Sequence, residues 1–323
     1  MTSHVTTPLQ AFQTAAERTQ LASTLDAVRD ICRLPETPED EQLAACIAEQ
    51  LQSREWLAAA EPVVAGILAE SDVQPLAGRL WSQIQVRQEH WDAFKQLRVM
   101  VDDGPAGEAA AETWLQLLVE RRQPLQLLRM ASLGEHWLRR RPLLWGATLD
   151  ALRTLRQFRA ARFWIAHWQD FRSLDDRDLL NVAEILRATG QSRDAAEVNR
   201  LGWERSPESP GHACWLAVDD ALAGDYEATE KRLQAIDSAA LSPEYRSLHT
   251  LAAAAVSVGR ADAQRLPEVL TVARQSLDDL RGADPSLADD PARRVVYHKV
   301  LEQLADSGGV TMQLWAWWRR FRS

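Results

Sequence analysis

The feature that most constrains the fold is a similarity of the chain to itself that recurs about every 34 residues. Seven segments each contain an apolar helix-like run, a short polar turn and a second helix-like run. Aligned at the turn, their anchor residues are Trp56, Trp91, Pro124, Phe158, Ser192, Tyr226 and Ala261, with successive spacings of 35, 33, 34, 34, 34 and 35 residues. A fixed period of this length is typical of proteins in which small helical units stack on one another.

Small residues, glycines and prolines recur in phase with this period. Most units have an alanine two positions after the anchor, and the fifth has it one position later: Ala58, Ala93, Ala160, Ala195, Ala228 and Ala263. Short side chains let two antiparallel helices approach closely. Gly190, Gly224 and Gly259 are expected to supply the left-handed residue that ends a first helix. Prolines, which the first helical turn tolerates, stand between units at positions 75, 105, 142, 210 and 243.

The composition is that of helices throughout. Only 14 Gly and 14 Pro interrupt 323 residues, and Ala, Leu, Arg, Glu and Gln fill the segments between them. With 46% hydrophobic residues the chain has enough apolar side chains to bury a core. We therefore predict an all-α protein.

These units resemble the tetratricopeptide repeat, a two-helix unit of 34 residues with Gly and an aromatic residue at its internal turn. Gly224-Asp225-Tyr226-Glu227-Ala228 is the closest match, and Ser206-Pro207 matches the close of a unit. The third unit departs from the pattern, with Pro124 at its turn. The resemblance implies a right-handed α-α superhelix, a solenoid of about seven helical hairpins. A related helical-hairpin repeat, the half-a-tetratricopeptide type with its frequent tryptophans, is the alternative.

The predicted organisation has three parts. Residues 1–38 form an N-terminal helical cap with one helix-like run between positions 11 and 34. Residues 39–283 form the array of tetratricopeptide-like repeats, and residues 284–323 form C-terminal helices with a Trp/Arg-rich end. Terminal segments that differ from the repeat and close its core are expected of solenoids.

The resemblance also implies that the first helices of successive units line a concave groove that binds a partner protein or peptide. The residues that it places in the groove are Arg79, Gln83, Arg87, Glu112, Gln116, Glu120, Asp150, Arg153, Glu184 and Arg187. In the second and third units these residues have i, i+4, i+8 spacing, so each triplet lies on one helical face. A polar surface with both charge signs suits a protein or peptide, although a solvated helix face has the same pattern.

One well-known groove of the family grips a terminal carboxylate with Lys, Asn and Arg. Arg79 and Gln83 stand at comparable places, but the asparagines are absent and Glu112 would repel a carboxylate. We therefore do not extend that specificity to this chain.

Arginine is concentrated in the middle of the sequence. The net charge between Arg121 and Arg172 is +8, although the whole chain carries −9. The basic band comprises Arg121, Arg122, Arg139, Arg140, Arg141, Arg156, Arg159 and Arg162. It suggests an acidic partner surface, head-to-tail contact between molecules or, with its interleaved aromatic residues, an RNA-binding module. A general preference for Arg over Lys explains the band without any function, and the overall negative charge disfavours nucleic acid as a partner.

Tryptophan has two expected roles. Trp81, Trp114, Trp145 and Trp215 each precede a turn by ten to thirteen residues and are expected in the core between helices. The C-terminal segment is different, and its docking candidates are Trp315, Trp317, Trp318 and Phe321. As a helix with arginines nearby, this segment can dock a partner or rest on an anionic membrane surface. A cap folded onto the last repeat is the alternative.

Motifs of catalysis and metal binding are absent from the sequence. The seven histidines form no His-x-x-x-His pair, and neither a Gly-rich phosphate loop nor a Gly-x-Ser-x-Gly turn occurs. The three cysteines lack paired ligand spacing, and His212-Ala-Cys214 is more typical of a helix start than of a metal site. We therefore expect no enzyme, no cofactor and no metal.

The expected location is the cytoplasm, because no stretch reaches the roughly 18 apolar residues of a membrane span and the N-terminus has no secretory pattern. The function that these features favour is a non-catalytic scaffold or adaptor in the assembly or regulation of a complex. Two alternatives are an RNA- or nucleoprotein-binding module and an accessory subunit that positions substrates for an enzyme. The sequence does not indicate an oligomeric state.

Overall fold

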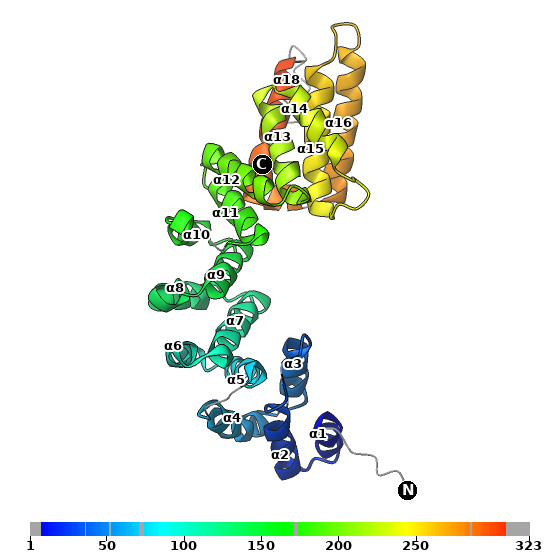
Figure 1. Cartoon of the computed structure of the whole chain (residues 1–323). Helices are drawn as coiled ribbons and strands as arrows, with labels where there is room; N and C mark the ends of the chain where they lie inside the picture. Colours follow the sequence, from blue (N-terminus) through cyan, green and yellow to red (C-terminus); the bar gives the residue numbers. More distant parts are fainter. Residues whose placement is uncertain are drawn as a thin grey trace. The chain divides into compact units, whose positions relative to one another are not determined.

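The structure is a computed structural model that describes residues 8–35, 37–51, 53–70, 74–170, 174–284 and 286–307. Every regular element in these ranges is helical, which confirms the all-α prediction (Figure 1). The helices form two compact units that divide between Gln157 and Phe158. The predicted repeat array at 39–283 therefore contributes helices to both units, and each unit is described separately.

The first unit contains α1 (Pro8–Glu17), α2 (Leu21–Ile31), α3 (Asp40–Gln50), α4 (Arg54–Leu68), α5 (Pro75–Arg87), the 3-10 turn η1 (Trp91–Ala93), α6 (Phe94–Asp103), α7 (Pro105–Glu120), α8 (Pro124–Leu138) and α9 (Pro142–Thr154). The single helix expected in the N-terminal cap is wrong. Two helices occur there, because Thr19 takes a positive φ of 55° and reverses the chain between α1 and α2.

The second unit contains α10 (Phe158–Trp164), the 3-10 turn η2 (Trp168–Asp170), α11 (Asp176–Ala188), α12 (Ser192–Arg205), α13 (Pro210–Ala223), α14 (Tyr226–Ala235), α15 (Pro243–Gly259), α16 (Leu266–Ala283), α17 (Ser286–Asp289) and α18 (Pro291–Ser307). Helices α11, α13 and α15 are the first helices of three successive hairpins. Helix α18 packs against all three of them.

The helix boundaries follow the residues that sequence analysis singled out. Five first helices, α5, α7, α9, α13 and α15, begin at the five prolines between the units. Four second helices begin at their anchor residues, Pro124, Phe158, Ser192 and Tyr226. The remaining anchors lie close to a boundary: Trp56 inside α4, Trp91 at the start of η1, and Ala261 in the loop before α16. Proline and polar turn residues thus set the period of the backbone.

The internal turns share one backbone motif. In five of the hairpins, the residue two positions before the next helical element has a positive φ: Glu89 (60°), Arg122 (51°), Arg156 (57°), Gly190 (86°) and Gly224 (81°). At each turn the N–H of the next residue donates to a carbonyl five residues back, as in Gln123 to Leu118 (2.8 Å) and Gln191 to Leu186 (2.8 Å). This is the Schellman ending of a helix, and it recurs with the period of the sequence.

Gly259 does not supply a left-handed residue, so that expectation is wrong. It is the last residue of α15, and a Cβ atom placed there would lie 2.0 Å from the ring of Tyr226 on α14. The missing side chain makes room for the tyrosine. Gly78 does the same in the first unit, where a Cβ atom would lie 1.9 Å from the carbonyl oxygen of Ala106. It allows α5 and α7 to cross closely.

The four tryptophans expected in the core are buried there. Trp81 of α5 and Trp114 of α7 pack with ring centroids 5.9 Å apart. Trp145 of α9 and Trp215 of α13 are likewise enclosed. In the second unit, α18 adds a row of buried apolar side chains to the core: Val296, Tyr297, Val300, Leu301 and Leu304.

Candidate functional site

The candidate site is a polar face on the first helices of the first unit. We define this polar face by Arg79, Gln83 and Arg87 on α5, by Glu112, Gln116 and Glu120 on α7, and by Asp150 and Arg153 on α9. These are the residues that sequence analysis assigned to the groove in this part of the chain. Because α5 contacts α7 and α7 contacts α9, the residues of the polar face lie on neighbouring helices.

An ion pair joins the polar-face residues of α5 to those of α7. Arg79 Nη1 lies 3.2 Å from Glu112 Oε2, and the same nitrogen donates to Thr113 Oγ1 at 3.4 Å. On α9, Arg153 Nη2 lies 3.3 Å from Asp150 Oδ1. All four charged side chains are partly accessible, so the polar face carries both signs of charge.

Several polar atoms of this face lack a hydrogen-bond partner among the described residues. Gln83 is only 6% exposed, and its Oε1 atom accepts no hydrogen bond. The Oε1 atom of the half-buried Gln116 and the Nε atoms of Arg79 and Arg87 are enclosed and unpaired as well. A buried polar atom without a partner costs about 1–3 kcal/mol, and such atoms are rare in folded proteins.

The surroundings of Arg87 disfavour the charged form of its guanidinium. Burial and the neighbouring Arg121 lower the pKa of its guanidinium, while Glu49 and Glu120 act in the opposite direction. Burial disfavours the charged form of a base, and a nearby anion stabilises it. An anionic group bound beside Arg87 would therefore relieve part of that cost.

The second unit departs from the groove expectation. Glu184 and Arg187 on α11 are only 5% and 1% exposed, so Arg187 is closed to a partner and Glu184 is about as buried as Gln83 on α5. The Arg187 guanidinium donates to both carboxylate oxygens of Asp219 on α13, at 2.8 and 2.7 Å. It also lies over the ring of Trp215, 4.6 Å from the centroid. The sequence did not reveal this partnership, because Asp219 stands 32 residues away from Arg187.

The arginines of the basic band have different surroundings. Within the first unit, Arg139 pairs with Glu135 at 2.9 Å, Arg141 pairs with Glu108 at 3.1 Å, and Arg121 donates to the Val86 carbonyl at 3.4 Å. Arg122 and Arg156 occupy left-handed turn positions, and Arg140 is exposed. Arg159 and Arg162 belong to α10 of the second unit. Several members thus have structural partners.

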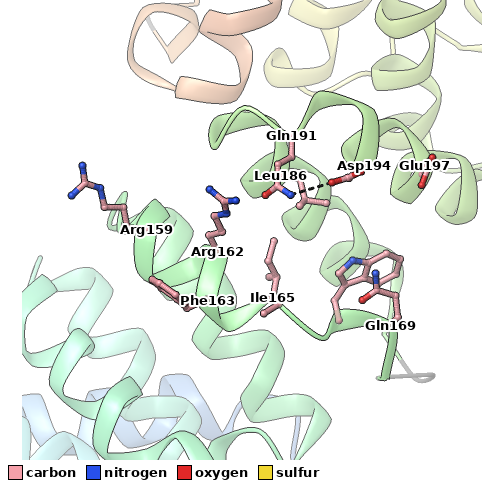
Figure 2. A pocket seen from close by; sticks show the side chains of 11 residues that line it. Arg159, Arg162, Phe163, Ile165, Gln169, Leu186, Gln191, Asp194 and Glu197 are labelled. Carbon is pink, nitrogen blue, oxygen red and sulfur yellow. Dashed lines mark hydrogen bonds between the residues drawn. The ribbon is translucent and has the colours of Figure 1, made fainter.

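A second feature lies in the second unit. A hollow of about 740 Å³ is lined by residues of α10, η2, α11 and α12 and of the adjoining turns, as Figure 2 shows. Arg159 and Arg162 stand at one side of it, and Asp194 and Glu197 stand at another. The sequence placed the two arginines in the basic band, but the acidic residues come from a different repeat.

A buried polar network that sequence analysis missed joins three helices of the second unit. His212, in the first turn of α13, is fully buried, with Nδ1 3.0 Å from Asn199 Oδ1 and Nε2 3.2 Å from Asp176 Oδ1. Ser209 donates to the other oxygen of Asp176 at 2.7 Å. Burial lowers the pKa of His212, although Asp176 opposes that shift. The histidine begins a helix as expected, and its contacts connect α11, α12 and α13.

Chemistry by the cysteines is disfavoured at two of three positions. Burial raises the pKa of Cys32 and of Cys214 to about 12, so both thiols stay protonated at neutral pH. Within the described ranges, no group of three or more His, Cys, Asp or Glu side chains is arranged to hold a metal ion. No described helix combines the length and apolar character needed to cross a membrane. The docking candidates Trp315, Trp317, Trp318 and Phe321 lie outside the described residues.

No protein-family model matches the chain, and no curated protein matches it.

Proposed function

We propose that the protein is a non-catalytic scaffold that binds a segment of a partner protein along the polar face of its first unit. In this proposal the hairpins form a right-handed solenoid of about seven tetratricopeptide-like repeats, and binding serves the assembly or regulation of a complex in the cytoplasm. The observation that carries the proposal is the row of enclosed, unpaired polar atoms on α5 and α7.

The chemistry of this face suits an extended polypeptide. The Oε1 atoms of Gln83 and Gln116 are acceptors, and the guanidinium groups of Arg79 and Arg87 are donors. The backbone of an extended peptide offers N–H donors and C=O acceptors in alternation, which can satisfy both kinds of group. Charged side chains on the partner would add specificity through the mixed charges of the polar face.

The proposal is tested by copurification with the tagged full chain at low and high salt. We expect a protein partner that stays bound at high salt, because a face of this kind relies on hydrogen bonds and packing more than on long-range charge. The double variant Arg79→Gln, Gln116→Ala should lose this partner while keeping its helical content. The matched control Arg33→Gln should keep it, because it breaks an exposed pair with Glu70 elsewhere in the same unit.

Two results would contradict the proposal. One is a partner that binds the double variant as well as the wild type. The other is recovery of nucleic acid alone, released as salt rises, since phosphate contacts weaken steeply with salt.

A further inference from the structure

The hollow in the second unit has the dimensions of a small-molecule site. Its volume of about 740 Å³ lies within the roughly 300–1,000 Å³ that is typical of ligand pockets. It belongs to α10, η2, α11 and α12 and shares no residue with the polar face of the first unit. The inference below therefore rests on residues other than those of the proposed function.

One side of the hollow offers two unpaired guanidinium groups. Arg159 and Arg162 lie one turn apart on α10, and both are exposed. Neither has a hydrogen-bond or ion-pair partner within the described part of the chain, in contrast to Arg139 and Arg141 of the same band. Two neighbouring guanidiniums without a carboxylate favour an anion with several oxygens, such as a phosphate.

Another side of the hollow is acidic. Asp194 and Glu197 lie one turn apart on α12, and Gln191 donates to Asp194 Oδ2 at 3.0 Å (Figure 2). Glu197 is within 3.8 Å of the exposed Arg193. These carboxylates repel an anion but accept hydrogen bonds from an amino group. A ligand that fits both sides therefore carries negative charge at one end and hydrogen-bond donors at the other.

The space between the charged sides is apolar and partly aromatic. Ile165 and Leu186 line it as buried side chains, and Trp168 is half-buried. Phe163 also lines it and is 79% exposed, which is unusual for a large apolar side chain. Exposed aromatic rings provide stacking surfaces for flat groups, and stacking on a nucleobase contributes about 1–3 kcal/mol.

We propose that this hollow binds a nucleoside monophosphate whose base carries an amino group. Arg159 and Arg162 hold the phosphate, Phe163 or Trp168 stacks on the base, and Asp194 or Glu197 accepts a hydrogen bond from the amino group. Inorganic phosphate alone would leave the apolar and acidic sides unused. Uracil has no amino group and offers a single N3–H donor between two carbonyl oxygens that the carboxylates repel, and an acidic peptide would meet the same repulsion.

The test is isothermal titration of the full chain with AMP, adenosine, UMP and inorganic phosphate. We expect AMP to bind more tightly than each of the other three ligands. The double variant Arg159→Ala, Arg162→Ala should weaken AMP binding by about tenfold or more, since charged hydrogen bonds to the phosphate are lost. Glu197→Gln should narrow the preference for AMP over UMP. All substituted side chains are exposed, so circular dichroism should show unchanged folding.

A matched control and a second ligand complete the experiment. Arg140→Ala removes an exposed arginine of the same band from outside the hollow and should leave AMP binding unchanged. A 5′-phosphorylated oligoadenylate distinguishes the two sources of the ligand: tighter binding than AMP indicates the end of an RNA strand, and weaker binding indicates the free nucleotide. The proposal is overturned if AMP does not bind at millimolar concentration, if phosphate binds as tightly, or if the double variant binds AMP normally.

Discussion

The two units use their first helices in opposite ways. In the first unit, α5, α7 and α9 present charged side chains that are partly accessible, although the amide of Gln83 among them is buried. In the second unit, α11, α13 and α15 are packed against α18, and the in-phase residue Arg187 is enclosed. One hairpin plan therefore gives either a polar face with accessible charges or a surface closed by the chain itself.

The difference shows what a repeat period does and does not determine. The period sets where helices start and turn, because prolines and Schellman turns recur with it. It does not decide whether the remaining side of a first helix stays open. That depends on what packs against the helix, here Asp219 and Trp215 of the next hairpin for Arg187, together with the apolar stripe of α18.

The largest expected effect concerns this stripe. Leu304→Ala on α18 should destabilise the second unit by about 2–5 kcal/mol, because it leaves a cavity in a closed core. Hydrogen exchange measured by mass spectrometry should show faster exchange in α11, α13 and α15 and unchanged exchange in α5 and α7. Leu125→Ala, at a side chain that is 78% exposed in the first unit, is the control and should change stability by less than about 0.5 kcal/mol. Equal losses of stability from the two substitutions would contradict the view that α18 closes the core of the second unit.

The next effect compares two ion pairs between first helices. Arg187→Ala should cost about 3 kcal/mol, because the enclosed guanidinium makes two hydrogen bonds to Asp219 and packs over the ring of Trp215. Arg79→Ala should cost less than about 1 kcal/mol, because the pair with Glu112 is more accessible. Chemical denaturation of both variants measures the two values. A larger loss of unfolding free energy for Arg79→Ala than for Arg187→Ala would contradict the view that the first unit's face is open and the second unit's face is closed.

Sequence reasoning predicted the helical character and many helix boundaries, but it did not predict the surroundings of individual side chains. The prolines and the turn anchors have local effects on the backbone, so their positions were readable along the chain. Arg187 was misjudged because Asp219 and Trp215 enclose it from the next hairpin. The hollow was not predicted either, since Arg159 and Glu197 belong to different repeats.

The left-handed turn positions also show a limit of sequence reasoning, because different residues occupy them in the two units. Glu89, Arg122 and Arg156 take positive φ values without being glycine, so a search for glycine finds only two of the five turns. The Schellman hydrogen bonds hold the conformation in every case. Backbone geometry is therefore more regular than the residues that form it.

These turns give a third prediction of about 1 kcal/mol. Arg122→Gly should stabilise the first unit by about 0.5–1 kcal/mol, because glycine relieves a left-handed residue of its Cβ contacts. Gly224→Ala should destabilise the second unit by about 1 kcal/mol for the converse reason. Thermal unfolding followed by circular dichroism measures both. Destabilisation by Arg122→Gly would show that the arginine side chain matters more than the turn.

The smallest effect is a dependence on pH that separates the units. Burial lowers the pKa of His212 below its ordinary value near 6.5, so folding favours the neutral ring. The stability that this provides is present above about pH 6.5 and is lost as the pH falls below that value. Burial shifts the pKa of His249 in the same direction, and it too lies in the second unit. Exchange protection of α13 should therefore fall between pH 7.5 and 5.5.

The histidine substitution His212→Gln provides the check on this interpretation. It should reduce the change in exchange protection between the two pH values, because the glutamine side chain does not titrate. An unchanged pH response in the variant would assign the effect to other groups.

The most direct test of the central claim is photo-cross-linking from single positions in the full chain. A cross-linking residue at Gln116, on the polar face of α7, should capture a partner protein from native extract. The same residue at Gln126, on the neighbouring helix α8, should not capture it. Capture from Gln116 that persists at high salt is the predicted result. Equal capture from both positions, or capture from Gln126 alone, would contradict the account.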